Sequence, residues 1–239
     1  MIVGEGEITI NKDLYYVLLK ANIADIKQVK KLIKSSHVYV NDICITDIKY
    51  QVNQYDKIRV DDTFVKYPFV YYMINKPKGY VCANSDKENK CITDLFEDEV
   101  NCIGRLDKDT TGLLLLTNDT NHVKRLLYPE NHHKKKYLVT LDHTLNDDLV
   151  ELFYKGVQLQ NYLCLPAILE IIDVYNCYIT IEEGKYHQIK KMFHKYGYKV
   201  VELHRMTFGP LVLDTNLKLG EYRKLNDEEL KKLEESIRV

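Results

Sequence analysis

The sequence predicts an α+β protein with two parts: a small helix-and-strand unit at the N-terminus and a larger domain on a mixed, mainly antiparallel sheet. Three observations lead to this prediction. Residues 1–66 show helical spacing followed by short β-type runs. Beyond residue 70, strands and helices mix without a regular β-α-β alternation, which disfavours a doubly wound fold. The 239 residues are 45% hydrophobic and 29% charged, which is typical of a globular chain with a packed core.

The N-terminal unit begins with two predicted helices. Leu14, Val17, Leu18 and Ala21 recur at helical spacing, and a second helix fits Asp25 to Ser35. Residues 61–70 are predicted to be a linker, and we place the domain boundary between residues 66 and 67. The short strands of this unit are predicted at 38–40, 43–45 and 57–60.

Basic side chains form a stripe along the second predicted helix. Such a stripe is most often a solvated helix face. Here the segment 26–40 contains no acid, and Ser35, Ser36 and His37 add further hydrogen-bond donors. The apolar face of the helix packs inward, so the stripe stays free to contact RNA phosphates. Its members fall at i, i+3, i+4 and i+7: Lys27, Lys30, Lys31 and Lys34.

The larger domain, predicted to span residues 67–239, carries strands and helices in irregular order. Apolar or alternating runs predict strands at 70–74, 113–117, 137–141, 177–181, 200–203 and 222–225. Helical spacing predicts helices at 120–127, 145–155, 186–196 and 227–235, the second and third closed by Gly156 and Gly197.

A polar loop from Gly104 to Gly112 precedes a run of four leucines suited to a buried strand. A polar loop on a rigid strand is a good position for a catalytic carboxylate, and Asp107 is the candidate. Taken alone, the loop is more simply a turn, in which Asp107 or Asp109 accepts backbone hydrogen bonds. A calcium loop is disfavoured because leucines occupy the later ligand positions.

Several segments in order resemble the pseudouridine synthases, in the branch typified by the small-ribosomal-subunit enzyme RsuA. Residues 29–60 resemble an S4 RNA-binding domain, although the basic helix carries lysines where that family commonly has arginines. The resemblance covers nearly the whole chain. The segments that carry it are Asn75 to Gly79, Gly104 to Asp119, Lys136 to Val139, Glu183 to Phe193, Leu203 to Leu211 and Leu219 to Arg223.

The resemblance implies a chemistry: isomerisation of a uridine to its C-glycoside within RNA. Asp107 matches the carboxylate that this family uses. It would either attack C1′ covalently or remove a proton on the way to a glycal-type intermediate, and the sequence leaves both routes open. The reaction involves neither redox chemistry nor net hydrolysis, so no cofactor and no metal are expected.

The resemblance also implies roles for residues around Asp107. Tyr137 would stack on the target base, and Lys190 would pair with Asp107 and keep it ionised. Ile189 would form an apolar wall, and Arg105 would enter the space left when the uridine flips out of its stack. Two further residues, Lys76 and His187, and the four helix lysines are predicted to contact the RNA.

The charge balance of the whole chain gives no sign of a nucleic-acid partner. The formal net charge is −1, but residues 185–205 hold six Lys or Arg against Glu202, and residues 132–136 are basic. These segments are predicted to form a basic surface beside the cleft. No apolar run approaches the ~18 residues that cross a bilayer, and the first residues lack a signal-peptide pattern, so we expect a cytoplasmic monomer.

The expected partner is ribosomal RNA, in the form of a small-subunit assembly intermediate. The favoured substrate is 16S RNA, at a uridine of the 516 type, because the chain lacks the long basic tail of some large-subunit relatives. A 23S target is the nearest alternative. A non-catalytic ribosome assembly factor and a hydrolytic glycosidase are rivals from other classes; the glycosidase would need a second carboxylate opposite Asp107.

Overall fold

The computed structural model describes residues 11–128, 131 and 133–237. The chain forms two compact units: residues up to Val70 with Asn226–Glu234, and Tyr71–Leu225 with the last residues from Glu235. The predicted boundary after residue 66 stays a prediction. Two predictions, on the first seven residues and on His132 in the basic run, lie outside the described residues. Among the described helices, none is both long and apolar enough to cross a membrane.

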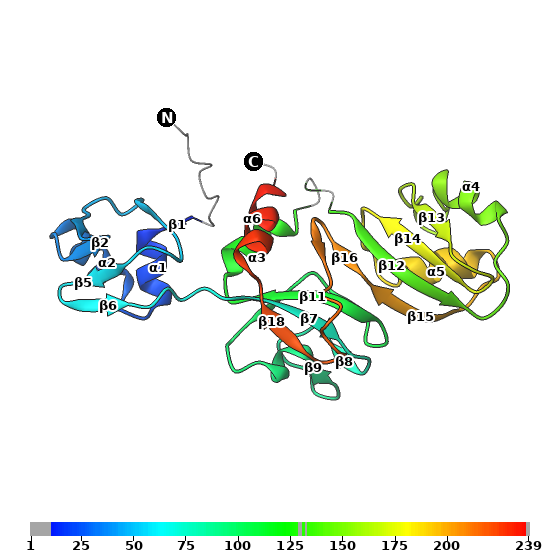
Figure 1. Cartoon of the computed structure of the whole chain (residues 1–239), viewed down its shortest axis with the longest axis horizontal. Helices are drawn as coiled ribbons and strands as arrows, with labels where there is room; N and C mark the ends of the chain where they lie inside the picture. Colours follow the sequence, from blue (N-terminus) through cyan, green and yellow to red (C-terminus); the bar gives the residue numbers. More distant parts are fainter. Residues whose placement is uncertain (1–10, 129–130, 132, 238–239) are drawn as a thin grey trace. The chain divides into compact units, whose positions relative to one another are not determined.

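The first unit packs two helices against short strands (Figure 1). Helix α1 (Leu14–Lys20) and helix α2 (Ile26–Lys34) bury Leu14, Val29 and Ile33 completely. Asp25 begins α2, and its carboxylate accepts a hydrogen bond from the Gln28 amide at 2.9 Å. The strands are β2 (Val38–Val40), β3 (Ile43–Cys44), β5 (Ile58–Val60) and β6 (Thr63–Val65) in one sheet, with β1 (Lys12–Asp13) paired to β4 (Gln51–Val52).

The predicted linker at 61–70 was wrong at its start. Thr63–Val65 forms β6, which pairs antiparallel with β5 in the register Ile58 to Val65. Asp61 adopts a left-handed backbone with φ 49°, so the chain reverses across Asp61 and Asp62. The exposed Phe64 beside the buried Val65 hid this strand, because apolar residues point to both of its faces.

The second unit is built on a sheet of eight strands. The sheet is mixed and mainly antiparallel, as predicted (Figure 1). The order is β13-β14-β12-β15-β11-β7-β18, and β10 pairs with one end of β11. All pairs are antiparallel except β11 with β15. The bounds are β7 (Tyr71–Lys76), β10 (Asn101–Ile103), β11 (Thr111–Thr117), β12 (Lys135–Leu141), β13 (Ile168–Ile171), β14 (Asn176–Ile181), β15 (Val200–Arg205) and β18 (Tyr222–Lys224).

Smaller elements complete this unit. The helices are α3 (Thr120–Leu126), α4 (Asp148–Tyr154) and α5 (Gln188–Lys195), with a 3-10 turn η1 (Ile92–Leu95). Two small sheets join β8 (Tyr80–Val81) to β9 (Lys90–Cys91) and β16 (Thr207–Phe208) to β17 (Leu211–Val212). Most of helix α6 (Asp227–Glu235) groups with the first unit.

Two predicted helices begin later than expected. Helix α4 begins at Asp148 instead of Leu145, since the Asn146 side chain accepts a hydrogen bond from the Asp148 amide at 3.1 Å. Helix α5 begins at Gln188 instead of Tyr186, since His187 has a left-handed backbone with φ 53°. In both cases a local turn, formed by a side chain or by the backbone, replaces the first helical turn.

The parallel contact between β11 and β15 lies at the centre of the sheet. The strands pair only at Thr111 with His204 and Gly112 with Arg205. Gly112 is required here: its φ is +104°, and a Cβ atom would lie 2.3 Å from the Arg205 carbonyl oxygen. This close approach holds the loop that precedes β11 against the end of β15.

Candidate active site

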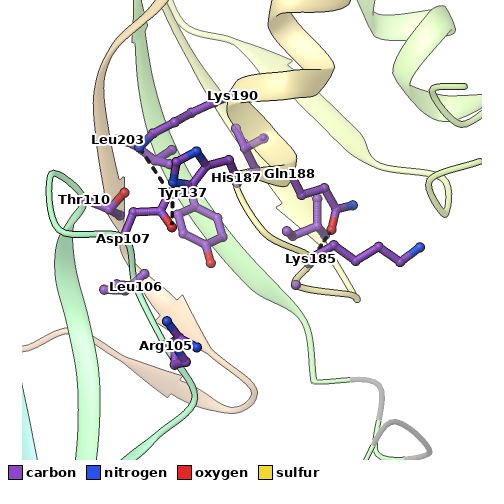
Figure 2. Close-up of a pocket in the computed structure, with 13 residues that line it drawn as sticks. Arg105, Leu106, Asp107, Thr110, Tyr137, Lys185, His187, Gln188, Lys190 and Leu203 are labelled. Carbon is purple, nitrogen blue, oxygen red and sulfur yellow. Dashed lines mark hydrogen bonds and ion pairs between the residues drawn. The ribbon is translucent and has the colours of Figure 1, made fainter. Parts of the chain in front are cut away.

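Asp107 lies in the loop between β10 and β11, which ends where β11 meets β15. The side chain is about one quarter exposed. It lines a cleft together with residues of β12, β15 and the start of α5 (Figure 2). The predicted Gly104–Gly112 loop therefore delivers Asp107 to a concave surface, whereas a simple surface turn would leave it in open solvent.

Lys190 on α5 lies beside Asp107, as the sequence predicted. Its ammonium is 3.1 Å from one Asp107 carboxylate oxygen and 2.5 Å from Asp109. Burial alone would lower the pKa of Lys190, but the hydrogen bonds to Asp109 and Asp107 outweigh burial and raise it. For Asp109, burial acts to raise the pKa, and the Lys190 ammonium reverses this and lowers it. The Lys190 ammonium therefore forms ion pairs with both carboxylates.

His187 approaches Asp107 from the other side. Its Nε2 is 3.6 Å from the second carboxylate oxygen, so it contacts the candidate catalytic group directly. The left-handed backbone at His187 turns the chain into α5 just before Ile189 and Lys190. A non-glycine residue held in this conformation is typical of functional sites. The sequence predicted His187 as an RNA contact and did not anticipate its place beside Asp107.

Three more of the predicted site residues line the same cleft: Tyr137, Ile189 and Arg105 (Figure 2). Tyr137 lies on β12 with its ring largely buried against the cleft, and Ile189 is buried on α5. Arg105 is exposed and lines the cleft two residues before Asp107. The structure thus brings together Arg105, Asp107, Tyr137, Ile189 and Lys190, which come from three segments distant in the sequence.

Lys76 does not face RNA, contrary to the prediction. The side chain is fully buried at the end of β7. Burial lowers its pKa. The ammonium is surrounded by the loop that carries Asp107, so Lys76 anchors this loop from within. It donates hydrogen bonds to the carbonyl oxygens of Pro77 (3.0 Å), Asp107 (3.2 Å), Lys108 (3.4 Å) and Thr110 (3.0 Å).

The sequence did not predict three contacts at the site. The first is the ion pair of Asp109 with Lys190, since Asp109 was considered only as a turn residue. Buried Gln188 fixes the turn before α5, because its side chain accepts from the Lys185 amide at 3.0 Å and donates to Glu183 at 2.6 Å. The Cys82 sulfur accepts from the Leu106 amide at 3.3 Å, next to Asp107. The distance of Cys82 from the loop along the chain gave no local signal of this contact.

The predicted basic surface beside the cleft is only partly present. Arg205 is 2% exposed, so it contributes no surface charge. Lys185 pairs with Glu183 at 3.0 Å, and Lys136 pairs with Glu170 at 2.5 Å. The remaining cations of α5, Lys191 and Lys195, are exposed. The charge of the cleft rim is therefore smaller than the sequence count suggests.

The four lysines of α2 form an exposed stripe in the first unit. Lys27, Lys30, Lys31 and Lys34 are all exposed, while Val29 and Ile33 on the opposite face are fully buried. The Lys30 ammonium lies 5.3 Å from the centre of the Tyr15 ring. A row of exposed ammonium groups on one helix face is suited to RNA phosphates.

The site places a carboxylate in a partly enclosed cleft, beside a lysine ammonium and a buried aromatic ring. Such a carboxylate can act as a nucleophile, as a base or as a counter-charge to a sugar cation. The neighbouring carboxylate, Asp109, comes from the same loop and binds the same lysine. That arrangement differs from the opposed pair of a glycosidase. Among the described residues, no group of three or more His, Cys, Asp or Glu is placed to bind a metal.

Known protein families match both parts of the chain. Residues 70–195 match the family model described as RNA pseudouridylate synthase, and residues 14–58 match the S4 domain. The chain is 46% identical over 166 residues to ribosomal small subunit pseudouridine synthase A of Escherichia coli, covering 67% of this chain and 72% of that protein.

Two longer matches extend the likeness to most of the chain. The protein of the same name from Haemophilus influenzae is 40% identical, covering 86% of this chain and 92% of its own. A crystal structure of a pseudouridylate synthase aligns with a TM-score of 0.66 at 38% identity, covering 92% and 98% of the two chains.

Proposed function

This chain belongs to the RNA pseudouridylate synthase family, and we propose that it modifies a uridine of small-subunit ribosomal RNA with Asp107 as its catalytic carboxylate. The activity itself follows from the family. The choice of substrate is supported by the names of the relatives, which are small-subunit enzymes at 40–46% identity. The S4 domain and its exposed lysine stripe support RNA as the macromolecule bound.

The proposed chemistry is an isomerisation without net loss or gain of atoms. The N1–C1′ bond of uridine breaks, the uracil turns while bound, and C5 forms a new bond to C1′. The proton on C5 is then removed, and N1 ends protonated. Asp107 would act either as a nucleophile at C1′ or as a base on a sugar proton. In either route its negative charge stabilises positive charge developing on the ribose.

Four neighbours of Asp107 are assigned roles in this reaction. Lys190 orients the carboxylate and balances its charge, supported by the 3.1 Å contact between the two groups. Tyr137 and Ile189 form the wall on which the uracil packs, supported by their position along the cleft. Arg105, exposed at the rim, fills the space that the flipped nucleotide leaves. Because all four groups come from one chain, a monomer is sufficient for activity.

The single observation that carries the proposal is the Asp107–Lys190 pair inside the cleft. A test in cells compares pseudouridine maps of 16S and 23S RNA with and without the gene. The expected result is the loss of one pseudouridine in 16S RNA, at the uridine 516 type of site, restored by the wild-type gene. Loss of a 23S pseudouridine instead would contradict the proposed substrate. Unchanged maps of both RNAs would favour an assembly factor.

A further inference from the structure

A second groove adjoins the cleft that holds Asp107. The two share Arg105, Tyr137, Gly184 and Lys185 in their walls, so the groove is continuous with the cleft. Its own wall includes Leu127 and Tyr128, which are 44% and 55% exposed. Its polar and aromatic side chains come from two regions. One is the start of β12 with the residues just before it, and the other is the end of β15 with β16. These side chains are His133, Lys135, Arg205 and Phe208.

Two buried nitrogens of this groove have no hydrogen-bond partner among the described residues. They are Nη2 of Arg205 and Nε2 of His133, in side chains that are 2% and 7% exposed. The Arg205 guanidinium is held in place, because its Nε donates to the Leu113 carbonyl at 2.6 Å. The His133 ring packs against Gly209, where a Cβ atom would lie 2.9 Å from its Nδ1. Buried nitrogens without partners are uncommon, and a bound anion or water can supply the partner.

Positive charge gathers at the same place. The Lys135 ammonium donates to the carbonyl oxygens of His133 (2.7 Å) and Glu182 (3.1 Å). Burial lowers the pKa of Lys135 to about 8, and the charge of Arg205 adds to this effect. The Phe208 ring centre lies 5.4 Å from the Arg205 guanidinium and 5.9 Å from the Lys135 ammonium, and both cations gather around this ring.

The acids of the groove are engaged with other cations. Glu183 pairs with Lys185 at 3.0 Å and accepts from Gln188, and Glu182 pairs with Lys134 at 3.7 Å. Among the described residues, neither carboxylate forms an ion pair with the Arg205 guanidinium. Two neighbouring cations with spare donors are costly in the free protein and are stabilised by an added anion.

We propose that this groove, here called the cationic groove, binds a backbone phosphate of the RNA next to the target uridine. The inference rests on the proposed function, since it assumes an RNA substrate in the adjoining cleft. A phosphate oxygen accepts hydrogen bonds from Arg205, His133 and Lys135 together, while exposed Leu127 and Tyr128 contact the attached sugar and base. The phosphate fixes the register of the strand, so that the uridine next to it enters the cleft beside Asp107.

The test replaces single phosphates of the RNA by neutral methylphosphonates, one position at a time around the target uridine. The RNA is the fragment that the wild-type chain converts, and kcat/KM for pseudouridine formation is measured. One position is expected to lower kcat/KM about tenfold or more, because the phosphate charge that Arg205, His133 and Lys135 contact is removed. In the Lys135→Gln variant the all-phosphate RNA loses a smaller factor, and the methylphosphonate at that position causes a smaller further loss than it causes in wild type.

Matched variants separate this contact from a structural effect. Lys135→Arg keeps the charge and retains the methylphosphonate effect. Lys155→Gln removes an exposed lysine of the same domain that pairs with Glu151, and it leaves both kcat/KM values within about twofold of wild type. If Lys135→Gln does not fold, as judged by circular dichroism, His133→Gln takes its place in the same comparison.

Two results would contradict the proposed phosphate contact. In one case, a methylphosphonate has no effect on kcat/KM at any position near the uridine. In the other, the methylphosphonate lowers kcat/KM by the same factor in Lys135→Gln and His133→Gln as in wild type. An RNA that wild type does not convert at all would instead contradict the proposed function. The two failures are therefore distinguishable, since the first occurs with active enzyme and the second without activity.

Discussion

At the scale of single residues, two lysines fix the loop that carries Asp107. Asp107 and Asp109 share the Lys190 ammonium, and the buried Lys76 holds the backbone of the same loop. Lys190 stabilises side-chain charge, and Lys76 satisfies carbonyl oxygens. Both lysines lie near Asp107, but their removal should have different effects. Loss of Lys190 should lower the catalytic rate, and loss of Lys76 should lower the stability of the fold.

Lys190→Met is expected to lower kcat about 10–100-fold, since hydrogen bonds to charged groups contribute about 1.5–3 kcal/mol. KM for RNA changes little, because Lys190 acts through Asp107. The raised pKa of Lys190 lies above 10.5, so the ammonium stays charged across ordinary assay pH values. Steady-state kinetics on the RNA fragment measure both constants, with Lys155→Met as the matched control. An unchanged kcat in Lys190→Met would contradict the role given to the pair.

Lys76→Met is expected to lower the free energy of unfolding by about 3 kcal/mol, because four carbonyl oxygens lose their donor. Burial lowers the folded pKa of Lys76, so between that pKa and 10.5 the unfolded chain binds more protons. Stability therefore rises with pH in this window, and the Met variant lacks that contribution.

Urea unfolding at several pH values measures this effect of Lys76. The control is Lys78→Met, which removes a half-exposed lysine from a surface pair with Glu202 and changes stability by less than about 1 kcal/mol. Equal stabilities for Lys76→Met and wild type would show that the loop has another anchor.

At the scale of elements, the contact of β11 with β15 positions the catalytic loop. The strand at 113–117 was predictable from its run of leucines, but its parallel partner was not. The pairing joins residues more than ninety positions apart, and no local pattern specifies it. The start of α5 was mispredicted for a related reason, since the left-handed His187 is imposed by the turn that Gln188 fixes.

Gly112→Ala tests this element contact. The added methyl group would meet backbone atoms of Arg205 at 2.3–2.9 Å, and the backbone cannot move aside as a flexible side chain does. We expect a loss of about 2–4 kcal/mol in the free energy of unfolding, together with reduced activity. Thermal unfolding followed by circular dichroism measures it. Gly184→Ala is the control, since a Cβ there meets nothing within 4 Å. A variant as stable as wild type would contradict the close approach.

At the scale of the whole molecule, the α+β class and the mainly antiparallel sheet were predicted from the irregular order of strands and helices. The core of the site, Asp107 with Lys190 and Tyr137, was predicted only through resemblance to a family. The loop alone read as a turn, because neither helical spacing nor composition reveals which distant lysine meets it. The RNA contact predicted for Lys76 failed, since sequence patterns do not report that a lysine is buried.

The lysine stripe of α2 predicts a salt-dependent contribution to RNA binding. Replacing Lys27, Lys30, Lys31 and Lys34 by Gln is expected to weaken binding of ribosomal RNA while leaving kcat at saturating RNA unchanged. The slope of log K against log salt becomes shallower by about 0.7–0.9 for each lost phosphate contact. Filter binding at several salt concentrations measures the slope. The matched variant with four Arg keeps the wild-type slope, and an unchanged slope in the Gln variant would exclude the stripe from the interface.

The central claim is that Asp107 carries the chemistry, and one measurement tests it most directly. Purified Asp107→Asn protein is incubated with small-subunit ribosomal RNA that lacks the modification, and pseudouridine is quantified. Asn is similar in size but lacks the negative charge, so binding of the RNA is expected to persist. We expect RNA affinity within about threefold of wild type and at least a roughly thousandfold loss of pseudouridine formation. Pseudouridine formed at the wild-type rate by Asp107→Asn would contradict the claim.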